Sequence, residues 1–169
     1  MKRISLVVAA FMLLSLFSNA QGIALDQLVQ MSDCADDSCF AEVVSPLGYT
    51  FGESNINEKN EIYTFRGSER YKLYAVRGTD FADMITYSIM NTGKTRSVAF
   101  RTVNAEHYHD FLGQLFNSEF KVSQEMKIEG GEFKSYKSDD PSKTITVTSR
   151  SKSFEDKDYI EFSIAIIRS

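Results

Sequence analysis

The sequence predicts an α+β fold of two tandem helix-plus-four-strand units, in which antiparallel sheets and helices pack in two layers. Three observations predict this fold. Apolar residues recur at helical spacing in two separate segments, 40–47 and 104–116. Each segment passes directly into the period-two alternation of a half-buried strand. The two segments also align, together with the strands that directly follow them, without a gap for some thirty-seven residues, which indicates an internal duplication.

Residues 1–20 have the pattern of a signal peptide. Lys2 and Arg3 provide the positively charged start, and residues 4–17 form an apolar run that only two serines interrupt. The end of this segment, Ser18-Asn19-Ala20, is a small-x-small cleavage motif. We therefore expect cleavage before Gln21 and a periplasmic or secreted location.

The expected mature chain, residues 21–169, has the length of a single α+β domain, with similar units at about 24–100 and 101–169. Because the leader holds two of the 19 basic residues and no acid, 17 basic and 23 acidic residues remain, a formal charge of −6. This acidic excess repels phosphate backbones, so we expect no nucleic-acid partner. No later segment approaches the roughly 18 apolar residues of a membrane helix, so we expect no membrane span.

The chain has two cysteines, Cys34 and Cys39, and both lie after the leader. Export to an oxidising compartment favours a disulfide between them. The loop that this bond closes is short, so chain entropy predicts a stabilisation of about 2 kcal/mol. Redox motifs more often have C-x-x-C spacing, and a zinc site would need two further ligands nearby. We expect a structural disulfide that joins two helices.

Two short helices are expected before residue 48. The first is indicated by an apolar stripe of Leu25, Leu28 and Val29. Asp36 or Asp37 is expected to cap the second helix, and Pro46 is expected to end it because proline lacks a backbone donor. Strands are then expected at 48–53, 61–66, 70–77, 83–90 and 94–103.

The second half begins with a helix that Asn104 is expected to cap. Its apolar stripe follows the spacing i, i+3, i+4, i+7 and i+8 with Tyr108, Phe111, Leu112, Leu115 and Phe116. Strands are expected at 120–128, 132–137, 143–150 and 158–167. The polar tract 149–158 has mixed charge, and we expect it to form a mobile loop.

The halves align at a constant offset of 71 residues for some thirty-seven positions, which places Phe40 on Phe111 and Phe65 on Tyr136. A connection four residues longer then moves the offset to 75, which places Ile85 on Ile160. We interpret this pattern as a duplication. The repeated plan is similar to that of the secreted β-lactamase inhibitory proteins, which also repeat a helical segment and a four-stranded sheet. This similarity concerns architecture and assigns no residue a role.

One face of the first unit's sheet is unusually apolar, and its candidate binding residues are Tyr71, Leu73, Met84 and Met90. Exposed apolar patches of this kind often mark partner sites, although a second packing layer between the two units would also bury them. We expect an exported, non-catalytic protein that binds a protein or an envelope component through this face.

Other functions depend on the central helix or on the space between the units. Glu106, His109 and Asp110 share one helix face, which allows a metal-dependent hydrolase, whereas His107 and His109 point to opposite sides. Acids at a helix start also complement the helix dipole, so we expect ordinary exposed side chains there, with no metal and no cofactor. No catalytic motif is present in the sequence, and we expect no catalytic residue. A further alternative is a carrier that holds a small apolar ligand between two sheets.

Overall fold

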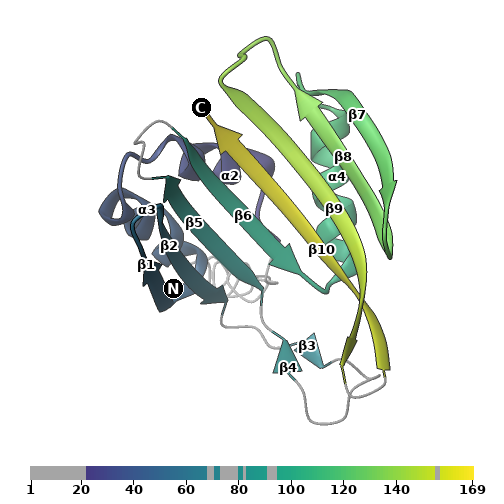
Figure 1. Cartoon of the computed structure of the whole chain (residues 1–169), viewed down its shortest axis with the longest axis horizontal. Helices are drawn as coiled ribbons and strands as arrows, with labels where there is room; N and C mark the ends of the chain where they lie inside the picture. Colours follow the sequence, from purple (N-terminus) through teal and green to yellow (C-terminus); the bar gives the residue numbers. More distant parts are fainter. Residues whose placement is uncertain (1–21, 68–70, 73–79, 82, 91–94, 155–156) are drawn as a thin grey trace, which may run out of the picture.

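The computed structural model describes residues 22–67, 71–72, 80–81, 83–90, 95–154 and 157–169. The predicted leader lies outside these residues. Within them the chain is α+β, with eight strands in one antiparallel sheet and three α-helices (Figure 1). The helices are α2 (Leu25–Asp33), α3 (Asp37–Val44) and α4 (Ala105–Phe116), and a short 3-10 turn, η2 (Ser45–Leu47), follows α3.

The sheet has the strand order β1-β2-β5-β6-β10-β9-β8-β7. In that order its strands are β1 (Tyr49–Ile56), β2 (Asn60–Gly67), β5 (Met84–Met90), β6 (Arg96–Thr102), β10 (Lys157–Arg168), β9 (Lys143–Phe154), β8 (Gly131–Lys137) and β7 (Lys121–Ile128). A separate two-stranded sheet pairs β3 (Tyr71–Lys72) with β4 (Asp80–Phe81). The strands of the first half therefore join those of the second half where β6 pairs with β10.

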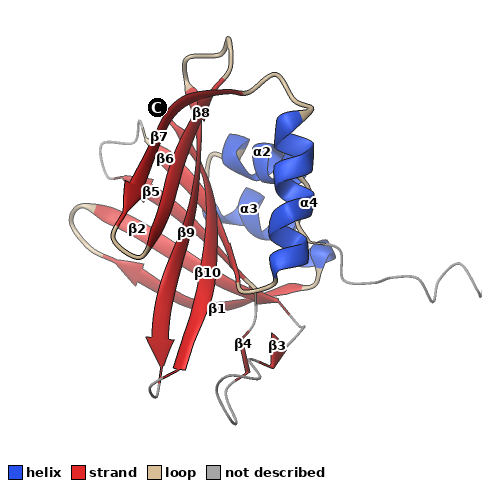
Figure 2. Ribbon diagram, turned by 90° about the vertical axis from the view of Figure 1, so that its right-hand side faces the viewer, coloured by secondary structure: helices blue, strands red, loops and turns tan. Residues whose placement is uncertain are grey.

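All three helices lie on one face of the eight-stranded sheet (Figure 2). They bury Phe40, Phe111 and Leu115 against the side chains of β5, β6, β9 and β10. On the sheet, the buried side chains of this core include Ile85, Tyr87, Val98, Phe100, Ile145, Val147, Ile164 and Ile166. Because side chains alternate along a strand, the residues between these point to the opposite face.

The helix ends follow local signals that the sequence predicts. Asn104 accepts a hydrogen bond from the backbone N–H of Glu106 at 2.9 Å, and Asp36 accepts one from Cys39 N–H at 2.8 Å, so both caps are confirmed. Pro46 lies in the 3-10 turn that ends α3. Gly48 follows with φ of 83°, a left-handed conformation that glycine adopts without strain.

The predicted disulfide between Cys34 and Cys39 is present and joins the end of α2 to the start of α3. The carbonyl oxygen of Cys34 also accepts hydrogen bonds from Tyr87 Oη at 2.8 Å and from Arg96 Nη1 at 2.6 Å. Lys143 Nζ on β9 forms a salt bridge with Oδ1 of Asp33 at a distance of 3.2 Å. The turn between the two helices is therefore fixed to β5, β6 and β9.

One predicted element is wrong, and a second is only partly described. The tract 149–158 was expected to be a loop, but Ser149–Phe154 continue β9 and Lys157–Asp158 begin β10. Its polar side chains fit a strand because β9 and β10 pair with each other there, beyond the core that the helices cover. Of the predicted strand 70–77, Tyr71 and Lys72 belong to the small separate sheet, and residues 73–77 lie outside the described residues.

The first two strands of each half pair in the same register. Phe51 pairs with Phe65 and Val122 pairs with Tyr136, which are equivalent pairs at an offset of 71. A register shift follows in both hairpins, after Phe51 in β1 and after Val122 in β7. The predicted offset of 75 is wrong, because β5 lies beside β2 as β9 lies beside β8. By their positions in the sheet, β5 of the first half is equivalent to β9 of the second half, and β6 is equivalent to β10.

Candidate functional site: the open face of the sheet

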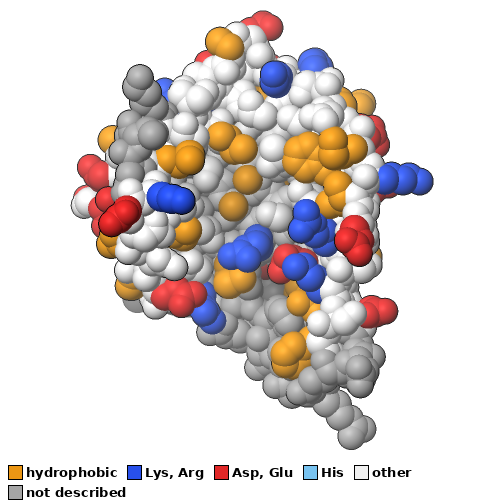
Figure 3. Space-filling view, viewed as in Figure 1, with side chains coloured by type: hydrophobic (Ala, Val, Ile, Leu, Met, Phe, Trp, Pro, Cys, Tyr) orange, Lys and Arg blue, Asp and Glu red, His pale blue; other side chains and the backbone are white. Residues whose placement is uncertain are grey.

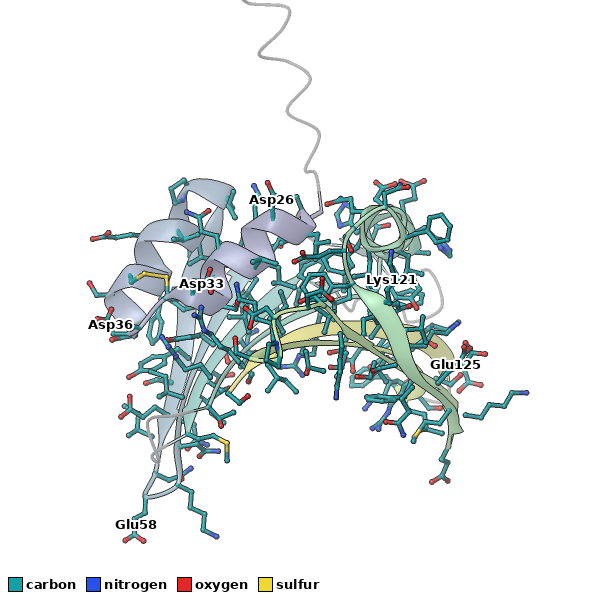
Figure 4. The ribbon with its side chains drawn as sticks, turned by 90° about the horizontal axis from the view of Figure 1, so that it is seen from above. Asp26, Asp33, Asp36, Glu58, Lys121 and Glu125 are labelled. Carbon is teal, nitrogen blue, oxygen red and sulfur yellow. A yellow bond between two sulfur atoms is a disulfide. The ribbon has the colours of Figure 1, made fainter. Side chains whose placement is uncertain are left out.

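We call the side of the sheet opposite to the helices the open face. Figure 4 shows the sheet as an arch, with Asp26 and Asp36 on the helix side and with Glu58 and Glu125 at its two ends. The inner, concave side of the arch is the open face. Among the described residues, no helix lies on it (Figures 2 and 4).

Cross-strand pairing arranges the open face in rows. The central row consists of small side chains and reads across six strands as Thr64, Thr86, Ala99, Ala165, Thr146 and Ser135. A second row continues from Met84 to Arg101, Ser163 and Thr148, and a third from Ser88 to Ser97, Ile167 and Thr144. Most members of the two neighbouring rows are also small, and their longer side chains are Met84, Arg101 and Ile167.

The predicted binding residues are only partly described. Met84 and Met90 both lie on the open face of β5, where Met84 is half-buried and Met90 is 48% exposed. Ile167 on β10 adds a second exposed apolar side chain, 37% accessible. Tyr71 is in β3, and its side chain lies outside the described part of the chain, as does the whole of Leu73.

The strand order bears on the two alternative roles of the apolar side chains. A second packing layer between the two units would need sheets that face each other, and so would a ligand held between two sheets. β6 pairs edge to edge with β10 from Arg96 to Thr102, so eight of the described strands, four from each half, form one sheet, and only β3 and β4 are separate from it. The eight-stranded sheet therefore gives no support to a second packing layer between the units, and the ligand carrier stays a prediction.

Charged side chains form a pocket at one end of the open face. A cavity of about 200 Å³ is lined by Arg101, Thr148, Arg150, Lys152, Glu161 and Ser163. We call this cavity the basic pocket. Figure 3, which looks onto the open face, shows Lys and Arg side chains gathered around acidic ones near the lower centre, with apolar groups above them.

Three strands supply the residues of the basic pocket. Arg101 lies on β6 beside Ser163 of β10, and Ser163 lies beside Thr148 of β9. Glu161 pairs directly with Arg150 across β10 and β9. Arg101 is half-buried, and its Nη2 lies 3.5 Å from Thr86 Oγ1, a long contact. Arg150 and Lys152 are exposed, so both remain accessible to a partner.

Sequence reasoning missed this pocket because it assigned the tract 149–158 to a loop. The available signal was the alternation of Thr148, Arg150 and Lys152, which places three side chains on one face of a strand. Arg101 could not be added from the sequence, since it lies on a strand of the other half of the chain.

The first turns of α4 differ from prediction at one residue. Glu106, His109 and Asp110 are exposed as expected, but His107 is buried. Its Nδ1 lies 3.0 Å from Oδ2 of Asp83, which is also buried. Within the described chain, no group of three His, Cys, Asp or Glu side chains is placed to hold a metal ion. The geometry therefore gives no support to the metal-dependent hydrolase.

A second cavity of about 710 Å³ lies between α4 and the segment before α2. Its lining includes His107, Asp110 and Gln114, together with Gly22 and Ile23. Gln114 Oε1 accepts a hydrogen bond from the backbone N–H of Leu25 at 2.7 Å, so this side chain already holds the two segments together.

None of the helices that the structure describes has the length and apolar composition needed to cross a membrane. No protein-family model, curated protein or solved structure matches the chain. The similarity in plan to the β-lactamase inhibitory proteins therefore stays a prediction.

Proposed function

We propose that the chain is an exported, non-catalytic protein that binds another protein through the open face of its sheet. The observation that carries the proposal is the concave surface, which no helix of the described part of the chain covers and on which Met90 and Ile167 are exposed together with the basic pocket. Protein interfaces combine apolar side chains with polar and charged ones, and the open face carries both kinds, with Met90 and Ile167 exposed and charged groups in the basic pocket. Apolar side chains that helices do not cover are typical of a partner site.

Export is the second part of the proposal. The leader pattern of residues 1–20 supports it, because a charged start, an apolar run and a small-x-small end occur together. The Cys34–Cys39 disulfide supports it independently, because disulfides persist in oxidising compartments. A periplasmic or secreted protein would meet its partner after both the leader is removed and the disulfide is formed.

The open face is further proposed to be the product of a duplication, with two similar units in one domain. The central row supports this proposal because its side chains repeat in reverse order across the middle of the sheet. Ala99 pairs with Ala165, and each alanine has a threonine as its next neighbour, Thr86 on β5 and Thr146 on β9. Thr64 and Ser135 end the row, and both are buried. A pseudo-two-fold axis between the two alanines would explain why the arch is continuous.

Changing Met84 and Met90 to Gln tests the proposed function. The partner captured from periplasmic or secreted extracts is expected to be lost, because polar amides replace the apolar contact surface. The free energy of unfolding is expected to fall by less than about 1 kcal/mol, since Met90 is largely accessible and the length of both side chains is retained. Pull-down and thermal unfolding measure the two effects.

Phe116→Gln is the matched control, because Phe116 is 85% exposed on α4, on the helix side of the sheet. This variant is expected to capture the partner normally. Unchanged capture by the Met84→Gln/Met90→Gln protein would contradict the proposal, and so would a large fall in its melting temperature, which would place these side chains in the core.

A further inference from the structure

We infer that the basic pocket binds the carboxylate groups of an acidic segment of the partner protein. This inference rests on the proposed function, which assigns partner binding to the open face, and it adds the chemistry of the partner. The charge of the basic pocket is opposite in sign to the net charge of the chain. The whole chain has a formal charge of −4, yet Arg101, Arg150 and Lys152 converge on one cavity that contains a single acid, Glu161.

The net charge of the residues that line the basic pocket determines how many negative charges a partner can place there. Three cationic side chains and one carboxylate leave a local excess of two positive charges among the lining residues. Within the described part of the chain, no salt bridge of 4.0 Å or less joins Glu161 to Arg150 or Lys152. Two carboxylates from a partner would balance this excess without removing an internal ion pair.

The chemistry of the lining suits carboxylates. A planar guanidinium presents paired N–H donors that match the two oxygens of a carboxylate, and Arg101 and Arg150 provide two such groups. The hydroxyl groups of Thr148 and Ser163 lie between them in the pairing of β9 and β10 and add further donors. Arg101 is half-buried, which reduces the side-chain entropy that binding must remove.

A protein segment fits the surroundings better than a phosphate polymer does. The row next to the pocket is uncharged, with Thr86, Ala99, Ala165 and Thr146, and Met84 lies directly beside Arg101. A nucleic acid would need basic side chains along its path, whereas an acidic segment that also carries apolar residues would meet both surfaces. Glu161 also disfavours a dianionic phosphate more than it disfavours a single carboxylate.

The test uses hexaglutamate peptide as the probe and follows backbone amide shifts of the full mature protein by NMR at low salt. We expect shifts concentrated at Arg101, Thr148, Arg150 and Ser163. In the Arg150→Gln/Lys152→Gln variant, the dissociation constant for hexaglutamate is expected to rise at least tenfold. Both changed residues are exposed, so the variant is expected to fold normally.

Lys59→Gln/Lys127→Gln is the matched control, because it removes the same charge from exposed positions that do not line the pocket. Its dissociation constant is expected to change less than twofold. Equal weakening in both variants would overturn the inference, as would shifts spread evenly over the surface or tighter binding of inorganic phosphate than of hexaglutamate.

The failure of this inference can be separated from failure of the proposed function. If the Met84→Gln/Met90→Gln protein loses its partner while Arg150→Gln/Lys152→Gln retains it with full affinity, the open face binds the partner and the pocket does not select acidic groups. If the hexaglutamate probe binds the pocket but neither variant affects partner capture, the pocket binds carboxylates and the partner binds elsewhere, which contradicts both proposals for the natural partner.

Discussion

Replacement of Phe40 by alanine is expected to lower the free energy of unfolding by about 3–5 kcal/mol. The Phe40 side chain is fully buried on α3. Its ring stacks on Tyr87 with centroids 4.6 Å apart and contacts Phe65 at 5.3 Å, so truncation leaves a cavity between the helix and β2 and β5. In a chain of this size each kcal/mol lowers the melting temperature by about 2–4 °C, so a fall of about 6–20 °C is expected in calorimetry.

Phe116→Ala provides the control for the same residue type. Because Phe116 is exposed at the end of α4, its removal is expected to change the free energy of unfolding by less than about 0.5 kcal/mol. Comparable losses in both variants would mean that α3 does not pack on the sheet as described. The core of the first half would then have to be assigned to other side chains.

Breaking the pair between Asp83 and His107 is expected to have a comparable effect. Asp83 is 5% exposed and His107 is 9% exposed, and the pair joins the residue directly before β5 to α4. Loss of one partner of a buried polar pair leaves the other without that contact in a low-dielectric site, which costs about 3–5 kcal/mol. We expect both Asp83→Ala and His107→Ala to lose stability in this range in urea denaturation.

A double-mutant cycle distinguishes a coupled pair from two independent buried groups. In the double variant the loss is expected to be smaller than the sum of the single losses, by about 0.5–3 kcal/mol, because the two side chains contact each other. Asp110→Ala removes an exposed acid from the same helix and serves as the control, with little expected change. Strictly additive losses would contradict the coupling.

Local elements were predictable because their signals are local. The cap at Asn104 and the apolar stripe of α4 predicted that helix within one residue of its observed bounds, Ala105–Phe116. The disulfide between Cys34 and Cys39 was predictable from composition, because these are the two cysteines of a chain expected to be exported to an oxidising compartment. Strand alternation also gave β2, β5 and β8 nearly complete.

The arrangement of these elements could not be predicted, because it depends on contacts between distant residues. The pairing of Ala99 with Ala165 joins the halves into one sheet, and no local pattern distinguishes it from two sheets face to face. His107 was expected to be exposed, but Asp83, twenty-four residues away, pairs with it in the interior. A single histidine next to acidic residues gives no indication of such a partner.

The candidate site was predicted in part. Met84 and Met90 lie on the open face as the alternation of β5 indicated, and their role in partner binding stays a prediction. The basic pocket was not predicted, because polarity and mixed charge in residues 149–158 indicated a loop when the segment forms paired strands. A segment rich in charged residues has the same composition whether it forms a long hairpin or a loop. Only the alternation of side chains along a strand distinguishes the hairpin.

The central claim, that the open face contacts the partner and the helix side does not, is tested most directly by site-specific photocrosslinking. A benzophenone amino acid would be placed at Met90 and Ile167 on the open face, and at His109 and Phe116 on α4, all accessible positions. The account predicts the same light-dependent adduct from Met90 and Ile167 and none from the helix positions. An adduct from His109 or Phe116, with none from Met90 and Ile167, would contradict it.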